Sequence, residues 1–372
     1  MEQGSCKSNH ACEKLRRDQN TMPAIDYYLI VRYSIIIWIN IMHQRKLGPF
    51  KVSAIGLGCM NMSSGYGPAD EQESIRLLNE CIDNGYNFLD TASMYGDGHN
   101  EALIGNTLKH RRDEYVLASK CGISKKADGG NEMNGRPEVI RQTCEDSLRR
   151  LQTDVIDLYY LHRLDPKVAI EESVGALGNL VTEGKIRTIG LSEMCAETTY
   201  RAHAEHPITA MQSEYSLWTR TPERKILSVC DELEISFVAF SPLARSFLTG
   251  ITSSTTEVDE DDIRANFARP RFEIDNFTKN LKLLDPYREI AEQQKCTMAQ
   301  LALAWVLARG SKNIIPIPGT RDVAHMIENA AAGDIELDDE TVQKLDELIN
   351  EKTVTGRRYT DVVMAATDSE RD

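Results

Sequence analysis

The sequence predicts a single (β/α)₈ barrel of the α/β class, a TIM barrel, with extra helices near the C-terminus. Strand-like and helix-like segments alternate regularly from Ser53 onward, and eight such strands fit within about 290 residues. A doubly wound sheet is the main competitor, but it normally carries a G-x-G-x-x-G turn after its first strand. Here that turn reads GLGCM at residues 56–60, which lacks the third glycine. The barrel is therefore the predicted fold.

The eight strands are short apolar segments that end in polar or glycine-containing turns. They are expected at 53–59, 87–92, 114–120, 156–162, 188–193, 210–215, 236–243 and 313–319.

Helices between the strands are indicated by caps and by apolar residues at helical spacing. Asp70 followed by Glu73 is a capping-box pattern, Pro137 fits a first helical position, and Thr297 is a cap for a strongly apolar helix. Helices that alternate with the strands are expected at 70–84, 101–109, 136–151, 168–183, 196–205, 222–234 and 322–332. Extra helices are expected at 280–294, 297–310 and 338–350, after a long acidic loop from 250 to about 276.

Three regions are expected along the chain: an N-terminal extension over 1–44, the barrel over 45–350, and a polar, mobile C-terminal tail over 351–372. The extension contains an apolar run, 27–39, that Arg32 interrupts. This run is short for a bilayer span and lacks the cleavage site of a signal peptide. It could associate with a membrane, but we expect it to lie outside the functional domain, with Met42 opening that domain.

Composition narrows the class of function. The chain has 372 residues, of which 41% are hydrophobic and 27% are charged. This length and hydrophobic content are sufficient for the core of two domains or of one large barrel. A net charge of −14 argues against general binding to nucleic acid or anionic membranes, although it allows a local basic pocket for a phosphate. The nine cysteines are scattered, without a C-x-x-C pair. We therefore expect reduced thiols in a cytoplasmic protein, with no disulfide framework and no metal site.

Four polar side chains stand at the C-terminal ends of neighbouring predicted strands. Asp90 and Tyr95 follow the second strand, Lys120 ends the third, and His162 ends the fourth. In a barrel these ends converge on one face. A buried lysine there needs a partner such as Asp90, and its charge is expected to lower the pKa of a neighbouring tyrosine. His162 could donate a hydrogen bond to a carbonyl oxygen that gains charge.

Each of these residues also has a purely structural interpretation. A lone histidine at a strand end is commonly a satisfied polar residue, and Asp90 with Lys120 could be a buried ion pair without catalytic function. Finding all four at successive strand ends is harder to explain in this way.

Several motifs together resemble the aldo-keto reductase superfamily. They are NFLDTASMYG (87–96), ASK (118–120), LYYLHR (158–163), GLSE (190–193), MQSEYS (211–216), FSPL (240–243) and IPGT (317–320), followed by Glu328-Asn329. The resemblance runs from about residue 45 to 349 and is closest to the branch of microbial, plant and fungal enzymes with Gly-Leu-Ser-Glu in strand five. It implies a barrel that binds NADP(H) in extended form and reduces aldehydes or ketones.

The resemblance also implies a role for each matching position. Tyr95 would be the general acid, Lys120 its partner, Asp90 the counter-ion of Lys120, and His162 the residue that orients the carbonyl. The implied cofactor-binding residues are Ser192, Glu193, Gln212, Phe240, Ser241, Pro242, Leu243, Arg245, Gly319, Thr320, Arg321, His325, Glu328 and Asn329.

Some positions depart from the pattern of the family. Many relatives have asparagine at Glu193, tyrosine at Phe240 and arginine at His325, and Ala244 and Ser246 replace common glycines. The change at His325 puts the strength of NADP preference over NAD in question, although Arg321 still favours NADP.

Two functions of different classes stay open. The first is NADPH-dependent reduction of aldehydes or ketones to alcohols, with hydride from nicotinamide C4 and a proton from Tyr95. The second is a cofactor-binding regulatory subunit resembling the β subunits of potassium channels, which share the barrel. A barrel metallohydrolase is disfavoured because strand one carries no His-x-His.

The expected ligand is a small-molecule carbonyl substrate, and neither nucleic acid nor stable membrane association is expected. The loops at 60–68, 122–136 and 218–220 should select the substrate, with Met94 and Trp218 either lining the pocket or packing. Aromatic aldehydes, short aliphatic aldehydes, dicarbonyls and pyridoxal all remain candidates, and the oligomeric state is open.

Overall fold

The computed structural model describes residues 42–126, 130–251, 259, 262–309 and 313–372, and every structural statement below refers to these. The expectation for the apolar run at 27–39 lies outside the described residues. Within them, no helix is both long enough and apolar enough to cross a membrane.

Eight parallel strands form the predicted barrel. In sheet order they are β12 (Ile314–Pro316), β11 (Ser236–Phe240), β10 (Ile208–Glu214), β9 (Ile186–Ser192), β8 (Ile156–Leu161), β5 (Val116–Cys121), β4 (Phe88–Asp90) and β3 (Leu57–Gly58). A parallel bridge between Gly58 and Gly319 joins the two edges, and the N–H of Gly56 donates to the Pro316 carbonyl at 3.0 Å. The sheet is therefore closed, and the predicted fold class is confirmed.

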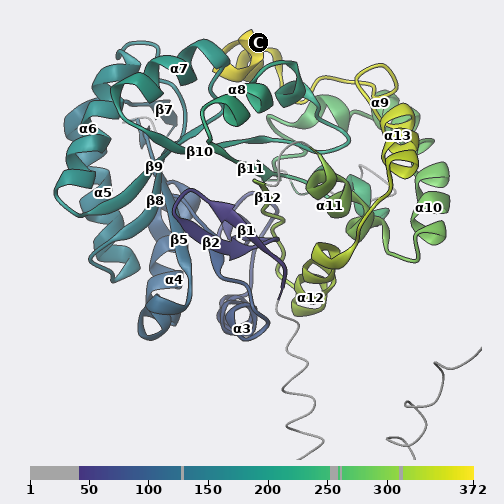
Figure 1. The fold of residues 1–372 in the computed structure, drawn as a ribbon, viewed down its shortest axis with the longest axis horizontal. Helices are drawn as coiled ribbons and strands as arrows, with labels where there is room; N and C mark the ends of the chain where they lie inside the picture. Colours follow the sequence, from purple (N-terminus) through teal and green to yellow (C-terminus); the bar gives the residue numbers. More distant parts are fainter. Residues whose placement is uncertain (1–41, 127–129, 252–258, 260–261, 310–312) are drawn as a thin grey trace, which may run out of the picture. The chain divides into compact units, whose positions relative to one another are not determined.

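Helices surround the strands in the expected alternation (Figure 1). They are α3 (Glu71–Asp83), α4 (His99–Leu108), α5 (Pro137–Leu151), α6 (Ile170–Thr182), α7 (Ala196–Glu205), α8 (Ile226–Glu232) and α12 (Val323–Ala331). The Asp70 carboxylate accepts from the N–H of Glu73, so Asp70 caps α3 as predicted.

The extra helices are α9 (Ile274–Leu281), α10 (Leu284–Gln293), α11 (Met298–Ala308) and α13 (Asp339–Leu348). Thr297 caps α11 in a capping box with Gln300. The helix predicted over 280–294 is confirmed as α10, but it begins later, at Leu284, after a break at residues 282–283 that separates it from α9. The sequence analysis did not predict α9. Pro286 has no N–H to continue an uninterrupted helix across that break.

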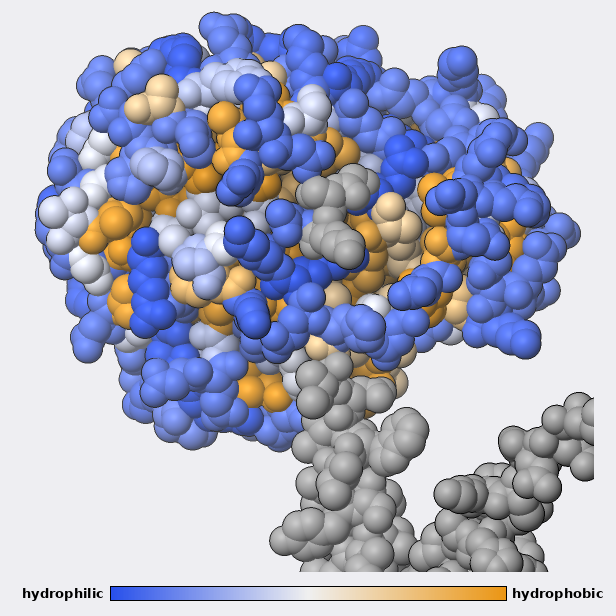
Figure 2. All heavy atoms as spheres, in the orientation of Figure 1, coloured by the Kyte–Doolittle hydropathy of each residue, from blue (hydrophilic) through white to orange (hydrophobic). Residues whose placement is uncertain are grey.

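The core has two layers, one inside the barrel and one between the sheet and the helices. Tyr160 points into the barrel and Tyr159 toward the helices, and both are fully buried. This alternation follows from the two-residue period of a strand. Hydrophilic residues cover most of the face shown in Figure 2, with hydrophobic residues in smaller patches between them.

A hairpin that the sequence analysis missed covers the N-terminal end of the barrel. It consists of β1 (Gln44–Leu47) and β2 (Phe50–Ser53), so the first predicted strand, 53–59, begins too early. The N–H of Gly48 donates to Ser236 Oγ at 3.1 Å, at the start of β11. Because this end is covered, ligands have access at the opposite end, where the strands terminate.

The expectation of a mobile C-terminal tail is wrong. Residues 351–372 include α14 (Asp361–Ala365) and a short 3₁₀ helix, Asp368–Arg371, and Arg358 is only 4% exposed. A buried arginine must be paired to be tolerated, and Arg358 pairs with Glu193 just after β9, with Glu214 of β10 and with Glu370 of its own segment.

Candidate active site

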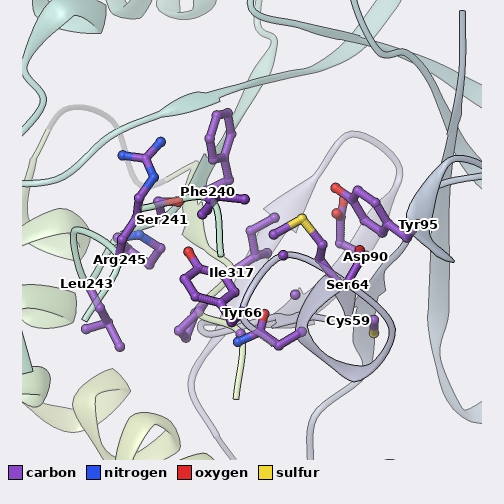
Figure 3. A pocket seen from close by; sticks show the side chains of 18 of the residues that line it. Cys59, Ser64, Tyr66, Asp90, Tyr95, Phe240, Ser241, Leu243, Arg245 and Ile317 are labelled. Carbon is purple, nitrogen blue, oxygen red and sulfur yellow. The ribbon is translucent and has the colours of Figure 1, made fainter. Parts of the chain in front are cut away.

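A cavity of about 1010 Å³ opens at the C-terminal ends of the strands. Figure 3 shows Asp90 and Tyr95 on one side of it and Ser241, Leu243 and Arg245 on the other. The predicted residues that line it are Asp90, Tyr95, His162, Ser192, Gln212, Phe240, Ser241, Pro242, Leu243, Arg245, Gly319, Thr320, Arg321, His325, Glu328 and Asn329. Residues from six strand ends and from α12 therefore surround one elongated space.

Lys120 is the centre of a buried polar cluster that contains Asp90 and Tyr95. It is fully buried, and its Nζ donates to an Asp90 carboxylate oxygen, to the Thr91 carbonyl at 2.8 Å and to Tyr95 Oη at 3.3 Å. The second Asp90 oxygen accepts from Gln212 Nε2 at 2.7 Å. The structure therefore brings Asp90, Tyr95 and Lys120 together as the strand-end pattern predicted.

Burial and ion pairing shift the pKa values of Asp90 and Lys120 in opposite directions. Burial alone would lower the pKa of Lys120, but Asp90 and Tyr95 outweigh it and leave that pKa raised. Burial also raises the pKa of Asp90, against the charge of Lys120. We take both groups as charged, because Nζ has three acceptors and both carboxylate oxygens accept hydrogen bonds.

The pKa of Tyr95 is shifted in the opposite direction from the one expected. Burial raises its pKa, and the charge of Lys120 offsets only part of that effect. The predicted net lowering of the pKa is therefore wrong for this structure. Tyr95 stays protonated at neutral pH, which is the state that a proton donor needs.

His162 completes the cluster at the end of β8. Its ring lies edge-on to the Tyr95 ring, with centroids 6.0 Å apart, and the residue is 8% exposed. Burial, together with the charges of Arg163 and Lys120, holds the pKa of His162 well below its ordinary value. The imidazole is therefore neutral and can act as a hydrogen-bond donor without carrying charge.

The loop after β11 has an unusual backbone. Ser241, Ala244, Arg245 and Ser246 all have positive φ, between 50° and 73°. The N–H of Ala244 donates to the Ser241 carbonyl at 2.9 Å, so these residues form a tight concave turn whose members Ser241, Arg245 and Ser246 line the cavity. Backbone turns of this kind can present N–H groups to an anion. A positive φ, as at Ala244 and Ser246, is a conformation that glycine adopts most readily.

Arg245 uses its guanidinium for a buried ion pair. Its two terminal nitrogens donate to the Glu214 carboxylate at 2.8 and 2.7 Å, and both residues are almost fully buried. The backbone of Arg245 thus belongs to the concave loop, while its side chain anchors that loop to β10.

The other end of the cavity is built around the start of α12. Asp322 caps the helix by accepting from the N–H groups of Ala324 and His325. The Arg321 guanidinium donates to the Pro68 carbonyl and, at 3.1 Å, to the Tyr66 carbonyl. Arg321 therefore fastens the 60–68 loop across the cavity and stands where an anionic group could reach it.

Glu193 is the one predicted cofactor residue that the structure turns away from the cavity. It has φ of 56° and is completely buried. Its carboxylate accepts from Arg358 at 2.6 and 3.1 Å and from the N–H of Glu214 at 2.8 Å. The side chain is held by the C-terminal segment, so a direct contact with a ligand in the cavity does not fit its position.

Several lining residues escaped the sequence analysis. Arg163 follows His162, Phe267 lies in the long loop after β11, and the C-terminal segment contributes Tyr359, Val363 and Thr367. Arg163 was visible as a charge beside a strand-end histidine, but nothing in the sequence marked the C-terminal residues.

The loops predicted to select the substrate are only partly at the cavity. Residues of the first two loops line it, including Met60, Tyr66, Ile123 and Met133, as does Met94. Trp218, from the third loop, is 2% exposed and stacks on Phe247 at 4.1 Å instead. Its role in the structure is packing.

The structure is a closed barrel with an Asp–Tyr–Lys–His cluster at one end of an elongated cavity. The family model described as "Aldo/keto reductase family" matches residues 54–350. The chain belongs to the aldo/keto reductase family, whose members are oxidoreductases.

Relatives and solved structures agree with this membership. An aldo-keto reductase of Schizosaccharomyces pombe, whose name specifies NADP(+), is 42% identical over 321 residues, covering 85% of this chain and 94% of that protein. The glycerol dehydrogenase of Gluconobacter oxydans is 29% identical with a TM-score of 0.76, covering 82% of this chain and 94% of that one. An aldo/keto reductase of Klebsiella pneumoniae, in complex with NADP and acetate, is 29% identical with a TM-score of 0.66, covering 86% and 99%.

Proposed function

We propose that this protein reduces aldehydes or ketones to alcohols with NADPH, and that Tyr95 supplies the proton. The observation that carries the proposal is the contact of 3.3 Å between Lys120 Nζ and Tyr95 Oη, inside a buried network that borders the cavity. The NADP named for the Schizosaccharomyces and Klebsiella relatives supports the choice of cofactor.

The lining residues suit an extended dinucleotide. Phe240 at the end of β11 offers a ring for stacking, and Ser192 and Gln212 offer polar groups to a carboxamide. The concave loop at 241–246 suits a pyrophosphate, and Arg321 suits a 2′-phosphate. Glu328 and Asn329 would then meet the adenine. Reduced nicotinamide supplies the hydride when bound.

Side chains of the protein would orient the carbonyl group and donate the proton. Neutral His162 donates a hydrogen bond to the carbonyl oxygen and orients it. As that oxygen gains negative charge, Tyr95 transfers its phenolic proton to it, and the cation at Lys120 stabilises the phenolate that remains. Asp90 keeps Lys120 charged and in place. Carbonyl, hydride and proton together give the alcohol.

The test compares wild type with Tyr95→Phe in NADPH oxidation with an activated aromatic aldehyde. Loss of a general acid should lower kcat by roughly 10²–10⁴-fold, while NADPH affinity, measured by fluorescence, stays unchanged. Tyr159→Phe is the matched control, because Tyr159 is fully buried on the helix side of β8. Equal turnover by Tyr95→Phe would reject the role of Tyr95, and NADPH binding without turnover of any carbonyl would favour the regulatory subunit.

A further inference from the structure

Arg163 is a charged residue that lines the cavity. It belongs neither to the Asp–Tyr–Lys–His cluster nor to the proposed cofactor-binding residues. It follows His162 and lines the cavity while remaining half-buried. Its Nη1 donates to the His162 carbonyl at 2.6 Å and to Ser192 Oγ at 3.0 Å. These two bonds hold the guanidinium between the ends of β8 and β9, at the catalytic end of the cavity.

Arg163 differs from two other cations around the cavity, Lys125 and Arg264, whereas Arg321 at the start of α12 resembles it in donating to carbonyl oxygens. Lys125 pairs with Asp97 at 3.1 Å, and Arg264 pairs with Asp262 at 2.7 Å. No carboxylate of the described residues lies within 4.0 Å of the Arg163 guanidinium. At longer range its charge lowers the pKa of His162, opposes the rise in the pKa of Tyr95 and helps to lower the pKa of Glu193.

The two acidic residues that the sequence puts nearest to this guanidinium are engaged elsewhere. Asp165 accepts from the N–H of Lys167 at 2.9 Å and of Gly135 at 3.0 Å. Glu193, next to Ser192, is held by Arg358. A guanidinium in a partly dry site favours an anionic partner, because charge-assisted bonds to a carboxylate are stronger than neutral ones.

We propose that Arg163 binds a carboxylate on the substrate, so that the enzyme prefers carbonyl compounds that also carry a carboxylate. Met94, Met133 and Tyr359 line the same cavity and suit an apolar or aromatic body between the two groups. This inference rests on the proposed reductase function and specifies its substrate class.

The experiment compares formylbenzoates with their methyl esters, which differ in charge but keep the aromatic aldehyde. We expect wild type to favour an acid over its ester by roughly tenfold to a hundredfold in kcat/KM. Arg163→Met should abolish this preference by raising KM for the acid alone, and Arg163→Lys should keep part of it. Arg201→Met removes an arginine outside the cavity that pairs with Glu171, and should leave the preference intact.

The outcomes separate this inference from the function on which it rests. If wild type reduces the esters but shows no preference for any acid isomer, the carboxylate site is rejected and the reductase function stands. If Arg163→Met weakens NADPH binding and reduces turnover of acid and ester equally, Arg163 contacts the cofactor and the inference is again rejected. If wild type reduces neither class, the reductase proposal fails and this inference falls with it. Melting curves of both Arg163 variants would establish that they are folded.

Discussion

Arg358 and Glu193, 165 residues apart in the sequence, form a buried ion pair at 2.6 Å that fastens the C-terminal segment to the end of β9. Ser369 and Glu370 add further bonds to the same two side chains. Because Tyr359, Val363 and Thr367 of this segment line the cavity, the ion pair helps to define one wall of the active site.

Breaking this pair should be costly. Arg358→Met leaves Glu193 buried without its counter-ion, and we expect the free energy of unfolding to fall by about 3–5 kcal/mol, measured with chemical denaturant. Arg357→Met is the control, because its pair with Asp361 is exposed and should contribute little. A double variant, Glu193→Gln with Arg358→Met, should lose less than the sum of the two single changes. Equal losses for Arg357→Met and Arg358→Met would contradict the anchoring role.

Stability should fall in acid because of Glu214. Burial alone would raise the pKa of its carboxyl, but Arg245 and Arg358 lower that pKa to about 2. A carboxyl whose pKa is depressed on folding stabilises the protein above its unfolded pKa and loses that effect as pH falls toward its folded pKa. Between about pH 4.5 and 2 this group alone should therefore cost up to about 3 kcal/mol.

The measurement for Glu214 is the denaturant midpoint at a series of pH values below neutrality. Glu214→Gln should be less stable at neutral pH, because it leaves two arginines poorly paired, and its stability should depend less steeply on acid. If wild type and variant lose stability in parallel on acidification, the titration belongs to other groups.

The rate of carbonyl reduction should not fall at about pH 6.5, where an ordinary histidine becomes protonated. The pKa of His162 is held well below its usual value and that of Tyr95 lies above its usual value, so both groups keep their active protonation states across neutral pH. We expect kcat/KM to stay flat between about pH 6 and pH 9, measured by steady-state kinetics. An inflection near neutrality that disappears in His162→Asn would show that His162 titrates normally.

Arg321 should determine the preference for NADPH over NADH. Removing a guanidinium that meets a phosphate typically costs about 1.5–3 kcal/mol, so Arg321→Leu should weaken NADPH binding by roughly tenfold to a hundredfold and leave NADH unaffected. His325→Arg should strengthen NADPH binding, because it adds a second cation near the start of α12. Fluorescence titration with both cofactors tests this, and an equal loss for NADPH and NADH would assign Arg321 only to holding the 60–68 loop.

Local patterns predicted the barrel and its alternation of elements well. The apolar strands, the caps at Asp70 and Thr297, and the polar residues that end each strand depend on chemical preferences within a few residues. Asp90, Tyr95, Lys120 and His162 could be placed together because parallel strands of a barrel end on one face. The β1–β2 hairpin was missed because it is held by bonds to Ser236 and to the carbonyl of Ile314, at the starts of two strands far along the chain.

The sequence by itself determined the fold class, the clustering of Asp90, Tyr95, Lys120 and His162, and the strand-end residues that line the cavity, since these follow from periodicity and from strand-end positions. Only the tertiary structure decided that Glu193 anchors the C-terminal segment, that Trp218 packs, and that burial outweighs Lys120 in the pKa of Tyr95. The physical reason is the same in each case. Burial and long-range ion pairing depend on which distant residues meet, and no local pattern in the chain contains that information.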